Sequence, residues 1–480
     1  MLRSWQKSCL SQAINFYKNE KHYFCLATPG AGKTVLAAEI AKVLLQKGDV
    51  DYVICLAPSK SVCEGIVQTF SRVLKNPFSG RLGSVGVAIT YQSLLSGHHQ
   101  LLADIIGNRV LVVLDEIHHC SGNEGVQGNA WGFQLVNQIS GLATYTLSLS
   151  GTPWRTDGFP ITFARYEDGC SQLSYHYEYG LRRAIQENNC RNPKVIALDV
   201  SRVSKKISSG SQHYSSIEEY LEDEENSYAD LLNNEILITE TLKRGVNKLA
   251  ELRKKSPNSG GLVVASSYQH AQMIKSILES QFSQSAVLVS YKNDDALDKI
   301  AAFRHSENQW IVSIAMISEG VDIPRLQVCC HLSDIKTELY FRQVIGRIIR
   351  MTADQSRNCY FYTLAEKSLV SYAKRLEQEV PGSYYKERIL EPLTDVALQS
   401  HANEQANSIL DELLLPENID VGVYCEHQAE EKVPENSNIE ASMHSLLSSN
   451  AALLSIEGFR EQVIQVLMTP GSLKTLSPEA

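Results

Sequence analysis

Continuous apolar runs alternate with helical patterns in two separate stretches of the 480-residue chain. An apolar run without polar alternation is typical of a parallel strand that is buried on both faces of its sheet. In the first stretch these runs occupy residues 23–27, 52–57, 85–90, 110–114 and 145–149. In the second stretch they occupy residues 262–265, 286–290, 310–315, 327–332 and 360–364. This arrangement predicts an α/β fold class, with two domains and mainly parallel sheets.

The same patterns set the predicted domain boundaries. We expect the first α/β domain at residues 1–155 and the second at residues 261–375. Residues 156–260 between them predict a linker or insertion with short strands and a helix. Residues 376–480 predict a mostly helical, acidic carboxyl-terminal extension, because the final 80 residues carry 13 acidic and only 3 basic side chains.

The bulk composition narrows the class of protein. The chain is 43% hydrophobic and 21% charged, as in ordinary folded domains. No apolar run approaches the roughly 18 residues of a membrane span, and the amino terminus lacks the apolar core of a signal peptide. We therefore expect a cytoplasmic protein with no membrane partner. The 11 cysteines form no paired Cys-x-x-Cys frame, which predicts reduced thiols rather than disulfides or a zinc ribbon.

The sequence ATPGAGKT occupies residues 27–34, directly after the first apolar run and before a helical pattern. In that context it predicts a phosphate-binding loop, although its first position holds alanine where glycine is common. Backbone N–H groups of such a loop close around phosphate oxygens, and the next helix adds its positive dipole end. Lys33 would reach the β- and γ-phosphates of ATP, and the Thr34 hydroxyl would bind Mg²⁺. The other predicted nucleotide contacts in the loop are Pro29, Gly30, Ala31 and Gly32.

An acidic pair, Asp115 and Glu116, follows the apolar run at residues 110–114. The carboxyl ends of parallel strands are where α/β sheets place ligand chemistry. We expect Asp115 to hold Mg²⁺ through water, and Glu116 to orient and deprotonate the attacking water. A transition-metal site on the next histidines and cysteine, residues 118–120, would need a fourth ligand, and none lies at a suitable spacing.

The segment YFRQVIGRIIR at residues 340–350 carries two stripes at helical spacing. One stripe is apolar and predicts a buried helix face; it consists of Phe341, Val344, Ile345 and Ile348. The other stripe aligns planar donors that suit a phosphate: Gln343, Arg347 and Arg350. Gly346 lies on the same polar side, and a glycine inside a helix costs about 1 kcal/mol relative to alanine. We therefore expect another element to approach the helix closely at Gly346.

Taken in chain order, these motifs resemble those of superfamily 2 helicases and translocases over roughly residues 1–365. The matching segments are residues 3–6 (adenine-reading motif), 27–34 (motif I), 57–59 (Ia), 90–94 (Ib), 115–118 (II), 150–155 (III), 264–267 (IV), 318–324 (V) and 343–350 (VI). Residues 152–158 and 317–326 are most similar to the branch related to restriction-enzyme motor subunits and DNA-repair translocases. Ile117 and His118 distinguish the chain from RNA-type DEAD-box proteins.

The resemblance implies two tandem RecA-like domains that bind ATP and Mg²⁺ between them. It implies that Arg347 and Arg350 act as arginine fingers and that Gln343 lies beside the γ-phosphate. Gln6 is implied to read the adenine. The further nucleotide contacts that it implies are Gly320 and Asp322, and the residues implied to couple the cleft to the nucleic-acid face are His118, Ser150 and Thr152.

The resemblance also implies that nucleic acid crosses both domains on the opposite face, held by its phosphates rather than read by sequence. The implied contacts are Pro58, Ser59, Thr90, Gln92, Ser266 and Ser318, with Arg155 and Arg325 as further candidates. The branch that the motifs resemble favours DNA over RNA.

The resulting prediction is an ATP-dependent DNA helicase or translocase, on its own or as the motor subunit of a restriction, repair or phage-defence system. The sequence has no nuclease signature, so any cutting would be the work of a partner protein such as a nuclease. The acidic carboxyl-terminal region suits either a docking or regulatory element for such a partner or a poorly ordered, solvated tail. The alternative prediction is an ATP-gated nucleic-acid sensor or clamp whose output comes from a partner protein. A strand-displacement assay separates the two.

Overall fold

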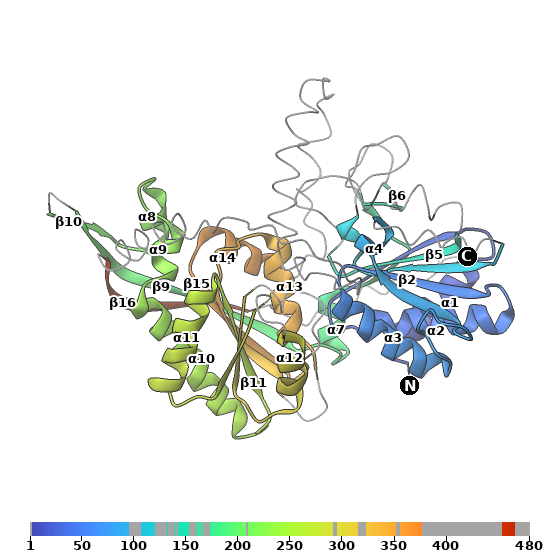
Figure 1. Ribbon diagram of the computed structural model, residues 1–480. Helices are drawn as coiled ribbons and strands as arrows, with labels where there is room; N and C mark the ends of the chain where they lie inside the picture. Colours follow the sequence, from blue (N-terminus) through green and yellow to red (C-terminus); the bar gives the residue numbers. More distant parts are fainter. Residues whose placement is uncertain are drawn as a thin grey trace, which may run out of the picture.

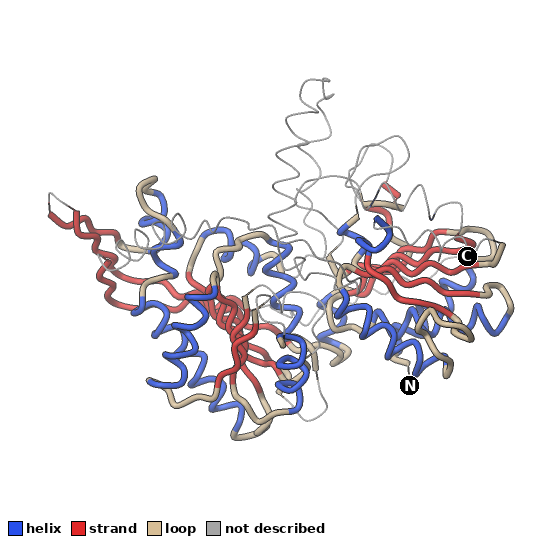
Figure 2. The backbone as a smooth tube through the Cα atoms, in the orientation of Figure 1, coloured by secondary structure: helices blue, strands red, loops and turns tan. Residues whose placement is uncertain are grey.

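The computed structural model contains two large sheets, each with helices packed against it (Figure 1). Drawn by secondary structure, the strands form two separate groups with the chain crossing between them (Figure 2). The structure describes residues 2–95, 107–120, 132, 139, 143–152, 161–163, 165–166, 173–207, 210–290, 295–314, 323–351, 356–376 and 454–465.

The first sheet has the strand order β3-β2-β4-β5-β1-β8, and every pairing along it is parallel. Its strands are β1 (His22–Ala27), β2 (Tyr52–Ala57), β3 (Gly86–Thr90), β4 (Val110–Leu114), β5 (Ala143–Ser150) and β8 (Tyr177–Tyr179). The five apolar runs of the first stretch are all strands, as predicted, and β8 is an addition. Almost every residue of β1, β2 and β4 is buried, which accounts for their unbroken apolar sequences.

Three helices lie side by side along this sheet (Figure 1). They are α1 (Ser4–Phe16), α2 (Lys33–Lys47) and α3 (Lys60–Leu74). The short α4 (Tyr91–Leu95) follows β3, and a single 3-10 turn, η1 (Ile117–His119), follows β4. Because the strands are parallel, the segments that follow β1, β2, β4 and β5 all emerge at one edge of the sheet.

The second sheet has the order β10-β9-β15-β14-β11-β13-β12, with β16 paired along β9. The strands are β9 (Asn192–Ile207), β10 (Gly210–Tyr214), β11 (Gly260–Ala265), β12 (Ala286–Val289), β13 (Trp310–Ser313), β14 (Leu326–Leu332), β15 (Asn358–Leu364) and β16 (Leu454–Gln465). The five runs predicted for the second stretch form its parallel centre, and β9 joins them in parallel. Both β10 and β16 pair with β9 in the antiparallel direction.

Helices cover both faces of the second sheet at β14. Cys330 contacts the α10 backbone, and the next residue, His331, lies against Tyr340 of α13. Since neighbouring strand residues point to opposite faces, α10 and α13 lie on opposite sides. The helices of this domain are α8 (Ile217–Glu222), α9 (Tyr228–Leu232), α10 (Glu235–Arg253), α11 (Tyr268–Ser280), α12 (Ala296–His305), α13 (Glu338–Ile348) and α14 (Lys367–Lys374).

The structure divides the expected linker, residues 156–260, between the two domains. Its strand β8 completes the first sheet, whereas β9, β10 and α10 belong to the second. Two short strands, β6 (Arg165–Tyr166) and β7 (Leu173–Ser174), form a separate antiparallel pair. The chain therefore crosses between the sheets over residues 180–191, which include α7 (Leu181–Gln186) (Figure 1).

The expected helical carboxyl-terminal extension, residues 376–480, lies mostly outside the described residues. Its described part beyond residue 376 is β16, a strand that forms an edge of the second sheet. None of the helices in the part of the chain that the structure describes has the length and apolar character to cross a membrane.

Candidate nucleotide site between the two domains

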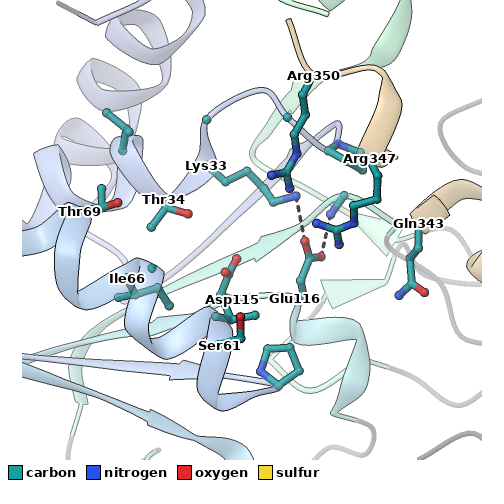
Figure 3. A pocket seen from close by; sticks show the side chains of 18 of the residues that line it. Lys33, Thr34, Ser61, Ile66, Thr69, Asp115, Glu116, Gln343, Arg347 and Arg350 are labelled. Carbon is teal, nitrogen blue, oxygen red and sulfur yellow. Dashed lines mark hydrogen bonds and ion pairs between the residues drawn. The ribbon is translucent and has the colours of Figure 1, made fainter. Parts of the chain in front are cut away.

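A cavity of about 430 Å³ lies between the two domains (Figure 3). The first domain contributes the phosphate-binding loop, the acidic pair and the start of the β5 loop to its wall. The second domain contributes Gln343, Arg347 and Arg350 of the α13 segment. The phosphate-binding loop and the segment at residues 343–350, which are more than 300 residues apart in the sequence, therefore line the same cavity.

The phosphate-binding loop connects β1 to α2. Gly30 and Gly32 have φ values of 77° and 95°, in the left-handed region that favours glycine. A Cβ added to Gly30 would lie 3.0 Å from Arg350 Cγ, and one added to Gly32 would lie 2.9 Å from Gln6 Nε2. Since α2 begins at Lys33, its first backbone N–H groups lie at the loop, as phosphate binding requires.

Lys33 and Glu116 form an ion pair across the floor of the cavity. The Lys33 Nζ lies 3.1 Å from Glu116 Oε1, and it also donates to the Ala27 carbonyl at 3.2 Å. The other carboxylate oxygen of Glu116 accepts from the Gly151 N–H at 3.2 Å. Burial acts to raise the pKa of Glu116, but the charges of Lys33 and His118 and these hydrogen bonds outweigh it. The pKa therefore lies well below its usual range.

Oxygen ligands suited to Mg²⁺ line the same cavity. The Thr34 hydroxyl and the Asp115 carboxylate both face it (Figure 3). The Asp115 main chain is fixed on both sides, because its N–H donates to Leu56 and its carbonyl accepts from the Tyr91 hydroxyl at 2.8 Å. No group of three or more His, Cys, Asp or Glu side chains in the described ranges could hold a metal alone. The donor set therefore fits a Mg²⁺ that also binds phosphate oxygens.

The α13 helix packs directly on the phosphate-binding loop. Its apolar stripe is buried as predicted, and Thr337 caps its amino end by accepting from the Tyr340 N–H. A Cβ added to Gly346 would lie 2.8 Å from Pro29 Cβ, closer than real side chains approach. The prediction that Gly346 marks a close approach is confirmed. Arg347, in the last turn of this helix, and Arg350, just past its end, point toward Glu116 and Lys33 (Figure 3).

Two family models match the chain in the two regions that form this cavity. Residues 1–155 match the model described as "Type III restriction enzyme, res subunit". Residues 244–352 match the "Helicase conserved C-terminal domain". The chain belongs to superfamily 2 of the helicases. Its branch is the one related to restriction-enzyme motor subunits, and its two α/β domains are tandem RecA-like domains.

Individual relatives agree with this assignment. An uncharacterized protein of Mycobacterium leprae is 27% identical over 409 residues, covering 82% of this chain and 67% of its own length. The DNA 3'-5' translocase XPB2 of Sulfurisphaera tokodaii is 23% identical over 371 residues, covering 73% of this chain and 78% of its own. A structure of the ATP-dependent Type ISP restriction-modification enzyme LlaBIII bound to DNA has a TM-score of 0.52 at 15% identity. That likeness covers 88% of this chain but only 33% of the enzyme, and it shows the fold alone.

A buried polar contact joins the two segments that superfamily 2 names motifs II and III. His118 Nδ1 lies 3.1 Å from the Ser150 hydroxyl, and the Thr152 N–H donates to the same hydroxyl at 3.2 Å. The His118 ring also lies 3.5 Å from Glu116. All three predicted coupling residues are therefore in one network that reaches Glu116. Their coupling role stays a prediction.

The adenine-reading motif of this superfamily 2 protein supports the phosphate-binding loop. The Gln6 side chain accepts from the Arg3 N–H at 2.8 Å and donates to the Gly32 carbonyl at 2.9 Å. Arg3 itself lines the cavity and donates to the carbonyls of Gly30 and Ala31. Sequence reasoning passed over Arg3, although its position in the same motif is a usable signal. Adenine recognition by Gln6 stays a prediction.

Four of the predicted nucleic-acid contacts lie at the carboxyl ends of the neighbouring strands β2 and β3: Pro58, Ser59, Thr90 and Gln92. Pro58 lines the nucleotide cavity, whereas Ser59 caps α3. Thr90 bonds to Ser93 at 2.8 Å beside a second hollow of about 450 Å³ between α3 and β3. Ser266, in the second domain, lies 2.8 Å from His270 Nδ1. Gln92 lies in α4.

Several predicted residues lie outside the described residues: Arg155, Ser318, Gly320 and Asp322. Arg325 is described and is a correction to the sequence prediction. Its side chain is only 4% exposed and donates to the backbone carbonyls of Asn258, Phe303 and Asn308. A guanidinium that is buried and bonded in this way is a structural group and is not available to nucleic acid.

Proposed function

We propose that the protein hydrolyses ATP in the cavity between its RecA-like domains and uses the resulting motion to translocate along nucleic acid, with DNA as the favoured track. One observation carries the proposal. The Lys33–Glu116 pair of the first domain faces Arg347 of α13 and Arg350, just past the end of α13, across a single cavity (Figure 3).

ATP binding would first rearrange the resting ion pair. The phosphates would be held by the loop N–H groups and the start of α2, and would draw the Lys33 ammonium away from Glu116. The loss of that positive charge would raise the pKa of Glu116, which makes it a stronger base for the attacking water. Mg²⁺ held by Thr34 and Asp115 would supply charge neutralisation on the phosphates.

The second domain would complete the site only when the two domains are close. Arg347 and Arg350 would then donate to the transferred phosphoryl group, where such arginines speed turnover by about 10³–10⁵-fold in other enzymes. The contact between Gly346 and Pro29 sets how closely α13 can approach. Hydrolysis would remove the group that both domains grip and allow the cleft to reopen, which gives one cycle of motion.

Two relatives support DNA as the track. The Sulfurisphaera tokodaii relative is named as a DNA translocase, and the LlaBIII structure is bound to DNA. We extend the proposal to a motor subunit of a restriction, repair or phage-defence system. A partner protein such as a nuclease would then bind the carboxyl-terminal region.

The test is the ATPase rate with single-stranded DNA, duplex DNA and RNA, with Lys33→Ala as the inactive reference. We expect DNA to raise turnover well above both the rate without nucleic acid and the rate with RNA. Equal rates under all conditions would contradict translocation. Stimulation without any displacement of a bound strand or triplex would instead favour an ATP-gated clamp.

A further inference from the structure

The segment that crosses between the domains touches both halves of the nucleotide site. Cys190 and Arg191 are the last two residues before β9. Cys190 forms a backbone bridge with Arg350, and its Sγ lies 3.7 Å from the Pro29 carbonyl of the phosphate-binding loop. This short stretch therefore lies between the loop and the arginine-bearing helix.

Arg191 holds the carboxyl end of α13. Its side chain is 0% exposed and donates to the Ile348 carbonyl at 2.8 Å, while its backbone N–H donates to the Ile349 carbonyl at 2.7 Å. The last carbonyls of a helix have no partner within the helix and carry the negative end of its dipole. A guanidinium at this point therefore caps the helix with charge-assisted hydrogen bonds.

The same guanidinium also fixes the segment that leads into β14. It donates to the Pro324 carbonyl at 2.9 Å and to the Leu326 carbonyl at 2.8 Å. Pro324 lies in the wall of the nucleotide cavity. One side chain therefore ties together the end of motif V, the start of β14 and the end of motif VI.

A buried charge is a costly way to fill space. Burial lowers the pKa of Arg191 to about 10, so the group remains charged at neutral pH despite its desolvation. An apolar side chain of similar volume would pack the same position without that desolvation. The hydrogen bonds to three separate carbonyls are what the arginine adds, because its planar fork reaches acceptors on different segments.

We propose that Arg191 is a positioning residue that sets Arg347 and Arg350 at the distance needed to reach the transferred phosphoryl group. The inference rests on the proposed ATP hydrolysis. Arg191 itself lies at the carboxyl end of α13 and need not touch the nucleotide. Its loss would let the last turn of α13 shift, and a displacement of about 1 Å at a catalytic group can cost about 100-fold in rate.

The test compares Arg191→Met with Arg325→Met. Arg325 is a matched control, because it is also buried in the second domain and also donates to three backbone carbonyls, none of them in α13. We expect both variants to lower the melting temperature. Only Arg191→Met should lower kcat, by about 100-fold, with KM for ATP changed less than about threefold. Its affinity for ADP with aluminium fluoride should fall by a similar factor, while its affinity for ADP alone is retained.

Equal kcat per folded molecule in the two methionine variants would overturn the proposal. If Arg191→Met does not fold, Arg191→Lys serves in its place, because a lysine keeps the charge but its donors radiate from one atom. Full turnover in that variant would also overturn the proposal.

If the unaltered chain binds nucleotide without hydrolysing it, the proposed function fails. The comparison of ADP with ADP–aluminium fluoride then decides the role of Arg191, and equal losses for both ligands would overturn it.

Discussion

The two halves of the nucleotide site are assembled in different ways. In the first domain, Lys33 follows β1, Glu116 and His118 follow β4, and both strands end at the same edge of one parallel sheet, with β5 between them. Glu116 already contacts Lys33 and His118. In the second domain, Arg347 lies in the last turn of α13 and Arg350 lies two residues past its end. The position of this helix depends on Gly346 at its face and Arg191 at its end. The first half is thus fixed by the sheet, whereas the second is fixed by contacts that cross between segments.

This difference assigns separate tasks to the two domains. A preassembled first half can bind nucleotide without the second, since the loop and α2 supply the phosphate contacts. The second half adds the contacts of Arg347 and Arg350 with the transferred phosphoryl group, and these contacts form only when α13 lies against Pro29. We therefore expect changes in the first half to alter binding, and changes in the second to alter turnover alone.

The largest effect is expected from the arginines. Arg350→Ala should lower kcat by about 10³-fold or more, because it removes charge stabilisation in the transition state. The affinity for a fluorescent ATP analogue should change little, and Arg357→Ala, an exposed arginine of the same domain, should leave both quantities unchanged. Parallel losses of binding and turnover in Arg350→Ala would show that the two tasks are not separate.

Glu116→Gln should lower kcat by about 10²–10⁴-fold through loss of the base. It should also tighten nucleotide binding, because Lys33 would lose the partner that competes with the phosphates. Titration with the same analogue and steady-state turnover measure the two effects. The control is Asp51→Asn, which breaks an exposed ion pair with Arg109 far from the cavity. Weaker binding in Glu116→Gln would disprove the competition.

Acid should destabilise the second domain, because two of its buried histidines bind protons more weakly in the folded than in the unfolded chain. Burial lowers the pKa of His270 and of His331 to about 4. The unfolded chain therefore binds more protons than the folded chain below pH 6.5, and stability falls as the pH falls through that value toward 4. At pH 5 the loss is about 2 kcal/mol for each histidine.

Urea titrations at pH 7 and pH 5, followed by the fluorescence of the buried Trp310 in this domain, measure that loss. His331→Phe should fit between Tyr340 and Phe361, whose rings flank the histidine, and should reduce the pH dependence. An unchanged pH dependence would mean that the pKa of His331 is the same in the folded and the unfolded chain.

The smallest effect is expected from Gly346→Ala. Alanine improves helix propensity by about 1 kcal/mol, but its Cβ would meet Pro29 and move α13 away from the loop. We expect kcat to fall about 10-fold or more, since alignment is lost while the arginines remain. The comparison is Gly65→Ala in α3, where an added Cβ meets nothing within 4 Å. Gly65→Ala should gain the full helix stability in denaturant titrations, and Gly346→Ala should not. The same gain in both would mean that α13 does not press on Pro29.

The sequence was most informative where a residue's neighbours in the chain determine its role. Apolar strands followed by the loop at residues 27–34 or by Asp115 and Glu116 are local patterns, and all the strands predicted from them are present. Between residues 156 and 260 only short strands were predicted, so the 16-residue length of β9 and its place in the second sheet were not. The far half of β9 carries exposed Arg202 and Lys206 among its apolar residues. A strand that is exposed along part of its length lacks the unbroken apolar signal of a fully buried strand.

Contacts made across the fold left no such signal. Arg191 lies in the polar sequence NNCRNPK, where nothing marks it as buried. Its three acceptors come from two segments, the one that leads into β14 and the end of α13, which only the folded second domain brings together. Arg325 was interpreted as a surface residue for the same reason. A single sequence does not reveal which arginines end up inside.

The described part of the carboxyl-terminal region, β16, belongs to the second domain. This strand pairs with β9 from Leu454 to Gln465, and β9 starts one residue after Arg191. A partner protein bound beside β16 would move together with the second domain. Its position relative to the phosphate-binding loop would therefore change in every cycle. A force on that partner would be transmitted through β9 to Arg191, which aligns Arg347 and Arg350.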